Sequence, residues 1–250
     1  MLLDLNHPYI VHYLAVGVLP FGPNGLPCPQ TAVLMEYCDG GTLNELCTTR
    51  KLTEGEILEF LQQIVAAVRY LHERPLPIFH GDIKGDNIFL TMDQVTCKLG
   101  DMENFHLLVE GKTNVGGLKV KEGTILHMSP EMLTYAFSAD DDEDVARSTG
   151  IGRASDVWSI GCTVLEMIGE GNIQFTTADK TIVSFESGKI NKFIKQVKSG
   201  ATPDQSTAAT RLSPKFGAIV ANCLLRTPAH RPTARELEAA LAGPLAGSRT

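Results

Sequence analysis

The sequence lacks the features of a membrane protein and of a disulfide-stapled secreted scaffold. No run approaches the roughly 18 apolar residues that a membrane-spanning helix needs, and Met1 opens no charged-then-apolar leader. The six cysteines are scattered without a C-x-x-C pair, so neither a zinc site nor a disulfide framework is indicated. Reduced thiols are typical of the cytosol and nucleus. We therefore expect no membrane partner and a cytoplasmic location, with the nucleus left open.

Clustered basic residues are also missing. The net charge is −7, and no Lys or Arg precedes Arg50. Binding to a nucleic-acid backbone needs grouped lysine and arginine, so we expect no nucleic-acid partner. With 250 residues, 43% of them hydrophobic and 20% charged, the chain is large enough to bury a sizeable core as an ordinary globular domain.

The stretch from Phe79 to Asp101, FHGDIKGDNIFLTMDQVTCKLGD, is where chemistry-bearing residues concentrate. It places isolated acids, a lysine and an asparagine at the ends of short β-like runs. Phosphoryl transfer needs an acid to orient a hydroxyl nucleophile, a cation near the transferring group and oxygen ligands for Mg²⁺. Asp82, Lys84, Asn87 and Asp101 supply that set. A lone Asp or Asn in a loop is in most cases a turn former, but this ordered set favours the catalytic interpretation.

This stretch resembles the H-R-D-L-K-x-x-N loop and the D-F-G turn of eukaryotic-type protein kinases. Other kinase-like segments follow the family's order: His7 to Val11 (H-P-N-I-V), Gly123 to Glu131 (G-T-x-x-x-M-A-P-E), Asp156 to Cys162 (D-V-W-S-x-G-C) and His230 to Thr233 (H-R-P-T). The resemblance covers nearly the whole chain and has the features of the serine/threonine class and its sterile-20 and MAP kinase kinase kinase branches. It implies an α+β, bilobal fold with a complete helical large lobe and a partial β small lobe.

The resemblance assigns catalytic roles to five residues. Asp82 would orient the substrate hydroxyl, and Lys84 would steady the γ-phosphate of ATP. Asn87 and Asp101 would bind Mg²⁺ through oxygen atoms. Thr124 would brace Asp82 and Lys84 by its hydroxyl.

The resemblance also assigns the nucleotide-binding residues. Met35 would be the gatekeeper, the backbone of Glu36 and Cys38 would meet the adenine edge, and Phe89 would pack under the adenine ring. The implied ligands are ATP and Mg²⁺. The implied partners are protein substrates, with a regulatory protein as a further candidate.

Two departures from the family pattern lie beside this set. Gly81 replaces the arginine that precedes the catalytic aspartate, so a phosphate on the activation segment would lack its guanidinium partner. That segment is expected over Asn104 to Lys121, with Thr113 as a candidate phosphorylation site. Asp101-Met102-Glu103 replaces D-F-G, and Glu103 both resists the backbone angles that glycine permits and adds negative charge beside the metal site.

Parts of a complete kinase cannot be placed upstream of His7. These are the glycine-rich loop, the strand lysine that holds the phosphates and most of the regulatory helix, with the glutamate that positions the lysine. We expect residues 1–243 to form a kinase domain without them, followed by a flexible tail at 244–250. Losing one preorganised donor costs about 10² to 10³ in rate, so the chain as it stands is expected to be a poor kinase or none.

Two functions therefore stay open at this stage. The first is a serine/threonine kinase that transfers the ATP γ-phosphate to protein hydroxyls, and a native start upstream of Met1 would supply its missing parts. The alternative is a catalytically weak or inactive kinase-like module that acts as a protein-binding scaffold.

The remaining segments predict structural elements. Residues 20–30 predict a loop between two strands, and Thr31 to Tyr37 predicts a buried strand. Thr53 to Glu56 predicts a capping box that opens a helix, whose core face holds Ile57, Leu61, Ile64, Val68 and Leu71. A second capping box is expected at Thr233 to Glu236.

Three polar features complete the expectations. Glu131 is expected to form a buried ion pair with Arg231, and Asp156 to hold the backbone of the catalytic loop from beneath. The acidic run from Asp140 to Asp144 lacks the alternating ligands and central glycine of a calcium loop. It therefore favours a solvated insertion, because like charges repel one another and stay hydrated.

Overall fold

The computed structural model of the chain describes residues 2–21, 27–102, 106–109, 112–113, 122–137, 151–186 and 188–243. Its α-helices are α1 (Leu43–Thr49), α2 (Glu54–His72), α3 (Pro130–Ala136), α5 (Arg153–Ile168), α6 (Ile190–Lys198), α7 (Ser206–Arg211), α8 (Pro214–Cys223) and α9 (Ala234–Ala242). Short 3-10 helices are η1 (Leu2–Asp4), η2 (Gly85–Asn87), η4 (Glu122–His127) and η5 (Pro228–His230).

Short antiparallel sheets connect these helices. The strands are β1 (Tyr13–Phe21), β2 (Pro27–Met35), β3 (Ile78–Phe79), β4 (Ile88–Leu90), β5 (Cys97–Leu99), β6 (His106–Val109), β7 (Lys112–Thr113), β8 (Phe175–Thr176), β9 (Ile182–Val183) and β10 (Thr202–Pro203). The sheet orders are β1-β2, β3-β6-β7, β4-β5 and β10-β8-β9.

Several expectations fall outside the described residues. They concern Glu103, the acidic run from Asp140 to Asp144, the tail at 244–250 and much of the activation segment from Asn104 to Lys121. Thr113 lies in β7, but its side chain is not described.

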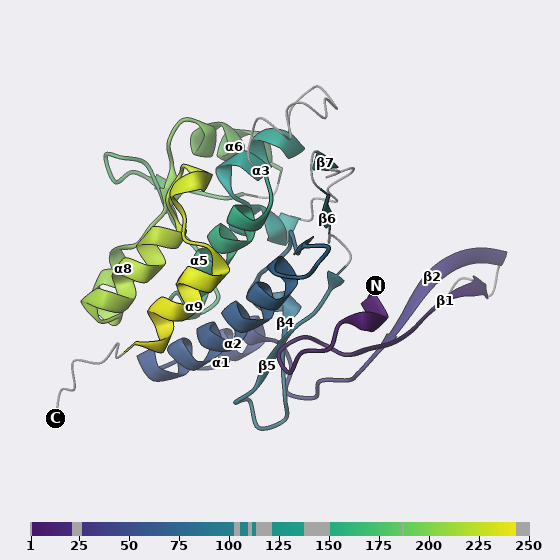
Figure 1. The fold of residues 1–250 in the computed structure, drawn as a ribbon. Coiled ribbons are helices and arrows are strands. Elements are labelled where there is room, and N and C mark those ends of the chain that lie inside the picture. The colour runs from purple at the N-terminus through teal and green to yellow at the C-terminus, as the bar shows by residue number, and fades with distance from the viewer. Residues whose placement is uncertain are drawn as a thin grey trace.

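Strands β1 and β2 form an antiparallel ribbon that extends away from the helical body (Figure 1). The predicted loop over residues 20–30 is too long, because β1 runs to Phe21 and β2 resumes at Pro27. Residues 22–26 between them lie outside the described ranges. Two nine-residue strands can therefore pair along most of their length.

The buried strand predicted for Thr31 to Tyr37 is wrong. Within β2, Val33 and Leu34 are 44% and 60% exposed. On β1, Val18 is 68% exposed. Apolar β-branched residues identify a strand, but burial depends on whether another layer packs on it. No described element covers either face of this part of the ribbon, so its apolar side chains remain open to solvent.

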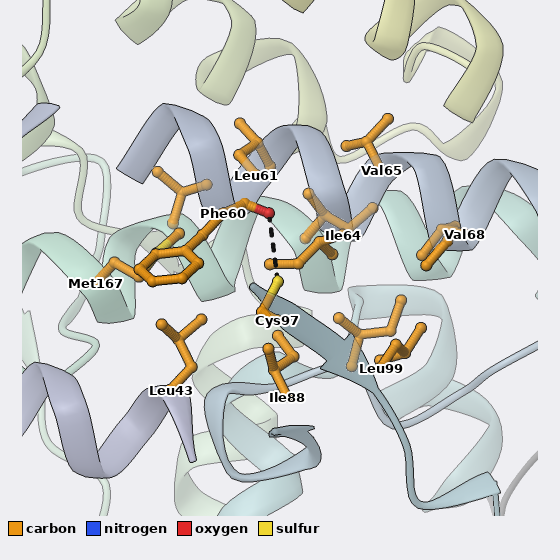
Figure 2. Close-up of a cluster of buried hydrophobic side chains, with 14 of the residues drawn as sticks. Leu43, Phe60, Leu61, Ile64, Val65, Val68, Ile88, Cys97, Leu99 and Met167 are labelled. Atoms are coloured by element: carbon orange, nitrogen blue, oxygen red, sulfur yellow. Dashed lines mark hydrogen bonds between the residues drawn. The ribbon is translucent and has the colours of Figure 1, made fainter. Parts of the chain in front are cut away.

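Helix α2 begins at the capping box that the sequence predicts. The Thr53 hydroxyl accepts from Glu56 N, and the Glu56 carboxylate accepts from Thr53 N at 2.8 Å. The predicted face is buried: Ile57, Leu61, Ile64, Val68 and Leu71 are all at most 2% exposed. Figure 2 shows Ile64 and Val68 on the side of α2 that faces Cys97 and Leu99 of β5, whereas Leu61 lies on the opposite side of the helix. Helix α2 thereby supports two strands that lie within the stretch from Phe79 to Asp101.

Helix α5 is the buried centre of the helical lobe. From Ser155 to Ile168 every residue is buried, including Trp158, which is fully enclosed. The predicted ion pair between Glu131 and Arg231 is confirmed, with two contacts of 2.6 and 2.9 Å. The same guanidinium lies 5.0 Å from the centroid of the Trp158 ring. One buried ion pair thus joins α3, α5 and the segment before α9.

No described helix combines the length and apolarity that a bilayer span requires.

The second predicted capping box is confirmed at the start of α9, where Thr233 and Glu236 exchange hydrogen bonds.

The α2 cap gives a test of pH-dependent stability. The Arg50 guanidinium, followed by Thr53 N, lowers the pKa of Glu56 from 4.5 to about 2. Because this pKa is lower in the folded state, the stabilisation is complete above about pH 4.5 and is lost as pH falls towards about 2. We expect Glu56→Ala to lower the free energy of unfolding by about 1 kcal/mol near neutral pH, and the deficit to shrink with acid.

Urea denaturation across this pH range measures the effect. Glu59→Ala is the matched control, since Glu59 is exposed on the same helix outside the capping box. An equal, pH-independent loss in both variants would contradict the role of the cap.

Candidate active site

The loop that carries the predicted catalytic residues is held by a buried carboxylate. Asp156, in the first turn of α5, is completely buried, as the sequence analysis expected of an anchor beneath the loop. Its Oδ2 accepts from His80 N at 2.9 Å, and its Oδ1 accepts from Gly81 N at 3.0 Å. His72 Nε2 lies 2.8 Å from the same Oδ2. The backbone just before Asp82 is therefore fixed from below.

Gly81 adopts a backbone angle that explains part of this geometry. Its φ is +77°, in the left-handed region that glycine enters without strain. The chain turns there so that two successive amides face one carboxylate. Gly81 stands where the H-R-D pattern has arginine, and glycine adopts the backbone angle of this turn without strain.

The structure brings Asp82, Lys84 and Thr124 together in a buried cluster. Lys84 Nζ donates to Thr124 Oγ1 at 2.8 Å and lies 3.2 Å from Asp82 Oδ1 and 3.3 Å from Oδ2. All three residues are at most 5% exposed. Asn87 Nδ2 donates to the carbonyl oxygen of Asp82 at 2.7 Å, which leaves its amide oxygen as the other polar atom.

The electrostatic surroundings keep Asp82 ionised. Burial by itself raises the pKa of Asp82, but the Lys84 ammonium, the Thr124 hydroxyl and Asn87 together bring it below its ordinary value. Asp82 Oδ1 makes no hydrogen bond among the described residues, although it lies within ion-pair distance of Lys84. One oxygen of this buried carboxylate therefore has acceptor capacity that no described residue uses.

Asp101 follows strand β5 and is tied to the same loop through its neighbour. Gly100 N donates to the carbonyl oxygen of Asn87 at 2.9 Å, and His80 Nε2 lies 3.0 Å from the carbonyl oxygen of Gly100. Asp101 itself has a φ of +53°, which Asp tolerates better than most residues. The two predicted metal ligands, Asn87 and Asp101, therefore sit on backbone segments that are hydrogen-bonded to each other.

The predicted nucleotide-binding residues lie on a separate part of the structure. Met35 ends β2 and is 42% exposed, and Glu36 and Cys38 follow it. Glu36 N donates to the carbonyl oxygen of His12. The backbone amide of Glu36 is therefore already paired, and its carbonyl oxygen is the other backbone group that an adenine edge would meet. Phe89, in β4, is partly buried and lies opposite Lys98 of β5.

The turn after Cys38 docks onto β4. Gly40 N donates to the carbonyl oxygen of Leu90, and Leu90 N donates to that of Gly41. A Cβ at Gly40 would lie 2.1 Å from the carbonyl oxygen of Thr91, so this close approach requires glycine. Phe89 and the end of β2 are joined by this contact.

Comparison with known proteins identifies the group to which this arrangement belongs. The protein kinase domain family matches residues 1–240. The chain belongs to the protein kinase domain family. The predicted α+β, kinase-like fold is thereby confirmed, and the mixed helix and strand content agrees with it.

The relatives of this chain are kinases by name, and one of them is named a serine/threonine-protein kinase. Mitogen-activated protein kinase kinase kinase 4 of Mus musculus is 33% identical over 234 residues, which is 93% of this chain and 12% of that protein. Serine/threonine-protein kinase Nek1 of Mus musculus is 27% identical over 95% of this chain and 16% of its own length. Mitogen-activated protein kinase kinase kinase 2 of Arabidopsis thaliana is 28% identical over 95% of this chain and 31% of its length. The chain thus spans a minor part of these relatives.

Three polar contacts of this kinase domain were missed from the sequence. Glu166 Oε2, at the end of α5, accepts from Gly85 N at 2.8 Å and lies 3.1 Å from His127 Nε2. Lys98 Nζ lies 2.7 and 2.8 Å from the two carboxylate oxygens of Glu36. Gly85 and Glu166 are 81 positions apart, Glu36 and Lys98 are 62 apart, and His127 and Glu166 are 39 apart. No local pattern signals such pairs.

The balance of forces on Asp82 can be measured directly. Replacing Lys84 by Met removes the main group that lowers the pKa of Asp82 and leaves burial, which raises it. We therefore expect the Asp82 carboxyl to titrate at higher pH in Lys84→Met than in the unmodified chain, as followed by carbon NMR of the carboxyl signal.

Lys98→Met provides the matched control. It removes one lysine that pairs with Glu36 instead of Asp82. We expect it to raise the pKa of Glu36, because the Lys98 hydrogen bond helps to lower that value against burial, and to leave the Asp82 titration in place. The same Asp82 shift in both variants would contradict a direct effect of Lys84.

Proposed function

We propose that this chain is the catalytic part of a serine/threonine protein kinase that transfers the γ-phosphate of ATP to hydroxyl groups of protein substrates. The observation that carries the proposal is the buried cluster of Asp82, Lys84 and Thr124, with an acceptor oxygen of Asp82 left without a hydrogen bond among the described residues. The names of the relatives favour an enzyme over a non-catalytic scaffold.

In this proposal Asp82 accepts the hydrogen of the substrate hydroxyl. Its Oδ1 points the hydroxyl oxygen toward the phosphorus, and its depressed pKa keeps it ionised at neutral pH. Lys84 places a positive charge beside the transferred group, and Thr124 fixes the lysine by accepting from Nζ. Positioning and charge are the main requirements of phosphoryl transfer, so three fixed side chains can supply much of the catalysis.

The oxygen atoms of Asn87 and Asp101 fit a Mg²⁺ ion by their chemistry. Mg²⁺ prefers hard oxygen ligands and takes one or two from protein when phosphates supply others. The Asn87 amide nitrogen is committed to the Asp82 carbonyl, so its oxygen is the atom that can face a cation. When bound, Mg²⁺ neutralises charge on the phosphate oxygens. Asn87 and Asp101 would hold it there.

We also propose that residues 1–243 belong to this domain. The adenine edge would meet the backbone of Glu36 and Cys38, with Met35 as gatekeeper and Phe89 against the ring. The contact of the turn at Gly40 with β4 supports this arrangement, because it places Phe89 beside the segment that follows β2. A regulatory protein partner stays a prediction.

A cytoplasmic location is the compartment that we propose for it. Cys38, Cys47, Cys97, Cys162 and Cys223 are free thiols. Burial raises the pKa of Cys47 and Cys97 to about 12 in each case, which keeps these thiols protonated and unreactive. Unpaired cysteines are typical of reducing compartments.

Phosphate transfer tests the proposed function. We expect Asp82→Asn to lower the incorporation of labelled phosphate from ATP and Mg²⁺ into a protein substrate by about 10² to 10⁴, and Asp101→Asn to lower it strongly through lost metal binding. The unmodified chain is the reference, and long incubations compensate for its low expected rate.

Asp93→Asn is the control for the change in charge. Asp93 lies in an exposed turn, where it caps Thr91 and Val95. Equal phosphate incorporation by the unmodified chain, Asp93→Asn and Asp82→Asn would refute the role of Asp82. If a longer native form that carries the glycine-rich loop and the strand lysine incorporates no labelled phosphate, the scaffold is favoured instead.

A further inference from the structure

A cavity lies where three helices of the lobe approach each other, away from the proposed catalytic residues. Its volume is about 720 Å³. It is lined by the end of α2 and the residues after it, by the first turn of α5, and by the segment from Pro228 to Arg235 that leads into α9. Figure 1 shows α2, α5 and α9 packed side by side. None of the residues proposed to bind ATP, Mg²⁺ or the substrate hydroxyl lines it.

Arginines dominate the charge of this cavity. Arg74, Arg153 and Arg235 line it together with a single carboxylate, that of Glu73. The chain as a whole carries a net charge of −7, so this concentration of positive charge is unlike the rest of the protein. A cavity lined by one sign of charge raises the local concentration of ligands of the opposite sign.

The three guanidinium groups differ in how far they are already satisfied. Arg235 Nε lies 2.8 Å from Glu73 Oε1, but its side chain is 68% exposed. Arg74 donates one hydrogen bond, to the Tyr70 hydroxyl at 2.7 Å, and lies over the Tyr70 ring. Arg153 is exposed and its guanidinium has no partner within the ranges that the structure describes. Each guanidinium carries five donors, so most of this hydrogen-bonding capacity is unused.

Two other polar groups of the wall are already paired on their inner side. Arg231 is held by Glu131 in two contacts, and His72 by Asp156. They leave the outward-facing arginines as the groups that can meet a ligand. Between them the lining is apolar, with Pro77, Val157, Pro228 and Pro232. Apolar walls bury the apolar surface of a ligand, and a few charged groups among them orient its charges.

We propose that this cavity is a docking site for an acidic peptide segment of a partner protein, one that presents several Asp or Glu side chains in an extended conformation. The planar guanidinium group binds carboxylates with two parallel hydrogen bonds, which favours such a segment over uncharged ones. The proline-rich wall accommodates the aliphatic parts of the peptide. The docking site is independent of the proposed kinase activity, since it shares no residue with that site.

Binding of a synthetic peptide tests the proposal on the full chain. The probe is a short fluorescent peptide rich in glutamate and proline, and fluorescence anisotropy measures its affinity at low and at physiological salt. We expect saturable binding that weakens with salt. We expect Arg153→Glu to weaken it by about tenfold or more, because like charges then face each other in the cavity.

Three controls make the test specific. Lys192→Glu makes the same change of charge on the exposed side of α6, outside the cavity, and is expected to leave binding within about twofold. The same peptide with every glutamate replaced by glutamine is expected not to bind. Circular dichroism of both variants verifies that they fold, which is expected because Arg153 and Lys192 are exposed.

Three results would overturn the proposal. The first is equal loss of affinity in Arg153→Glu and Lys192→Glu, which would show attraction to net charge alone. The second is the absence of saturable binding to the unmodified chain. The third is complete displacement of the peptide by low concentrations of inorganic phosphate, which would show a simple anion site instead of a peptide site.

Discussion

The position of the catalytic loop depends on one buried carboxylate. Asp156 accepts hydrogen bonds from two consecutive backbone amides, His80 N and Gly81 N, and lies beside His72 Nε2. A buried charge is stable only when its hydrogen-bonding capacity is met, and removing its partners costs several kcal/mol. The loop therefore cannot move away from α5 without leaving that charge unsatisfied. A constraint inside the lobe thus fixes the direction of Asp82.

The same principle recurs along α5. Glu166 at its far end accepts from Gly85 N, three residues after Asp82, and lies near His127. Glu131 packs against its first turn, where Ser155 Oγ donates to Glu131 Oε1 at 2.8 Å and Arg231 completes the pair. The catalytic loop is thus held from both ends of one buried helix. Because α5 is surrounded by apolar contacts, its acidic side chains have fixed positions. Their hydrogen bonds therefore set the position of the loop backbone.

The sequence predicted the helical lobe well because its signals are local. The capping boxes at Thr53 and Thr233, and the apolar face of α2, depend on residues three or four positions apart. The cluster of Asp82, Lys84 and Thr124 was expected from the resemblance, and the structure places the three in contact. The exposure of β2 and the contact of Lys98 with Glu36 could not be predicted. Both depend on which distant segments pack together, and that leaves no mark within a short window.

The β1-β2 ribbon is exposed, whereas the helical lobe is well packed, and the sequence of the ribbon explains part of this difference. No charged residue interrupts the chain between Tyr13 and Met35, and a two-stranded ribbon is marginally stable unless another layer packs on it. Its described connections to the helical lobe lie near its base and include the hydrogen bond from Val11 N to the Leu99 carbonyl and the pairing of Lys98 with Glu36. The acid and lysine of the catalytic loop are held within the lobe itself. Glu36 and Cys38, which would bind adenine, instead depend on these contacts at the base of the ribbon. We therefore expect a layer packed on the ribbon to change nucleotide affinity more than it changes the position of Asp82 and Lys84.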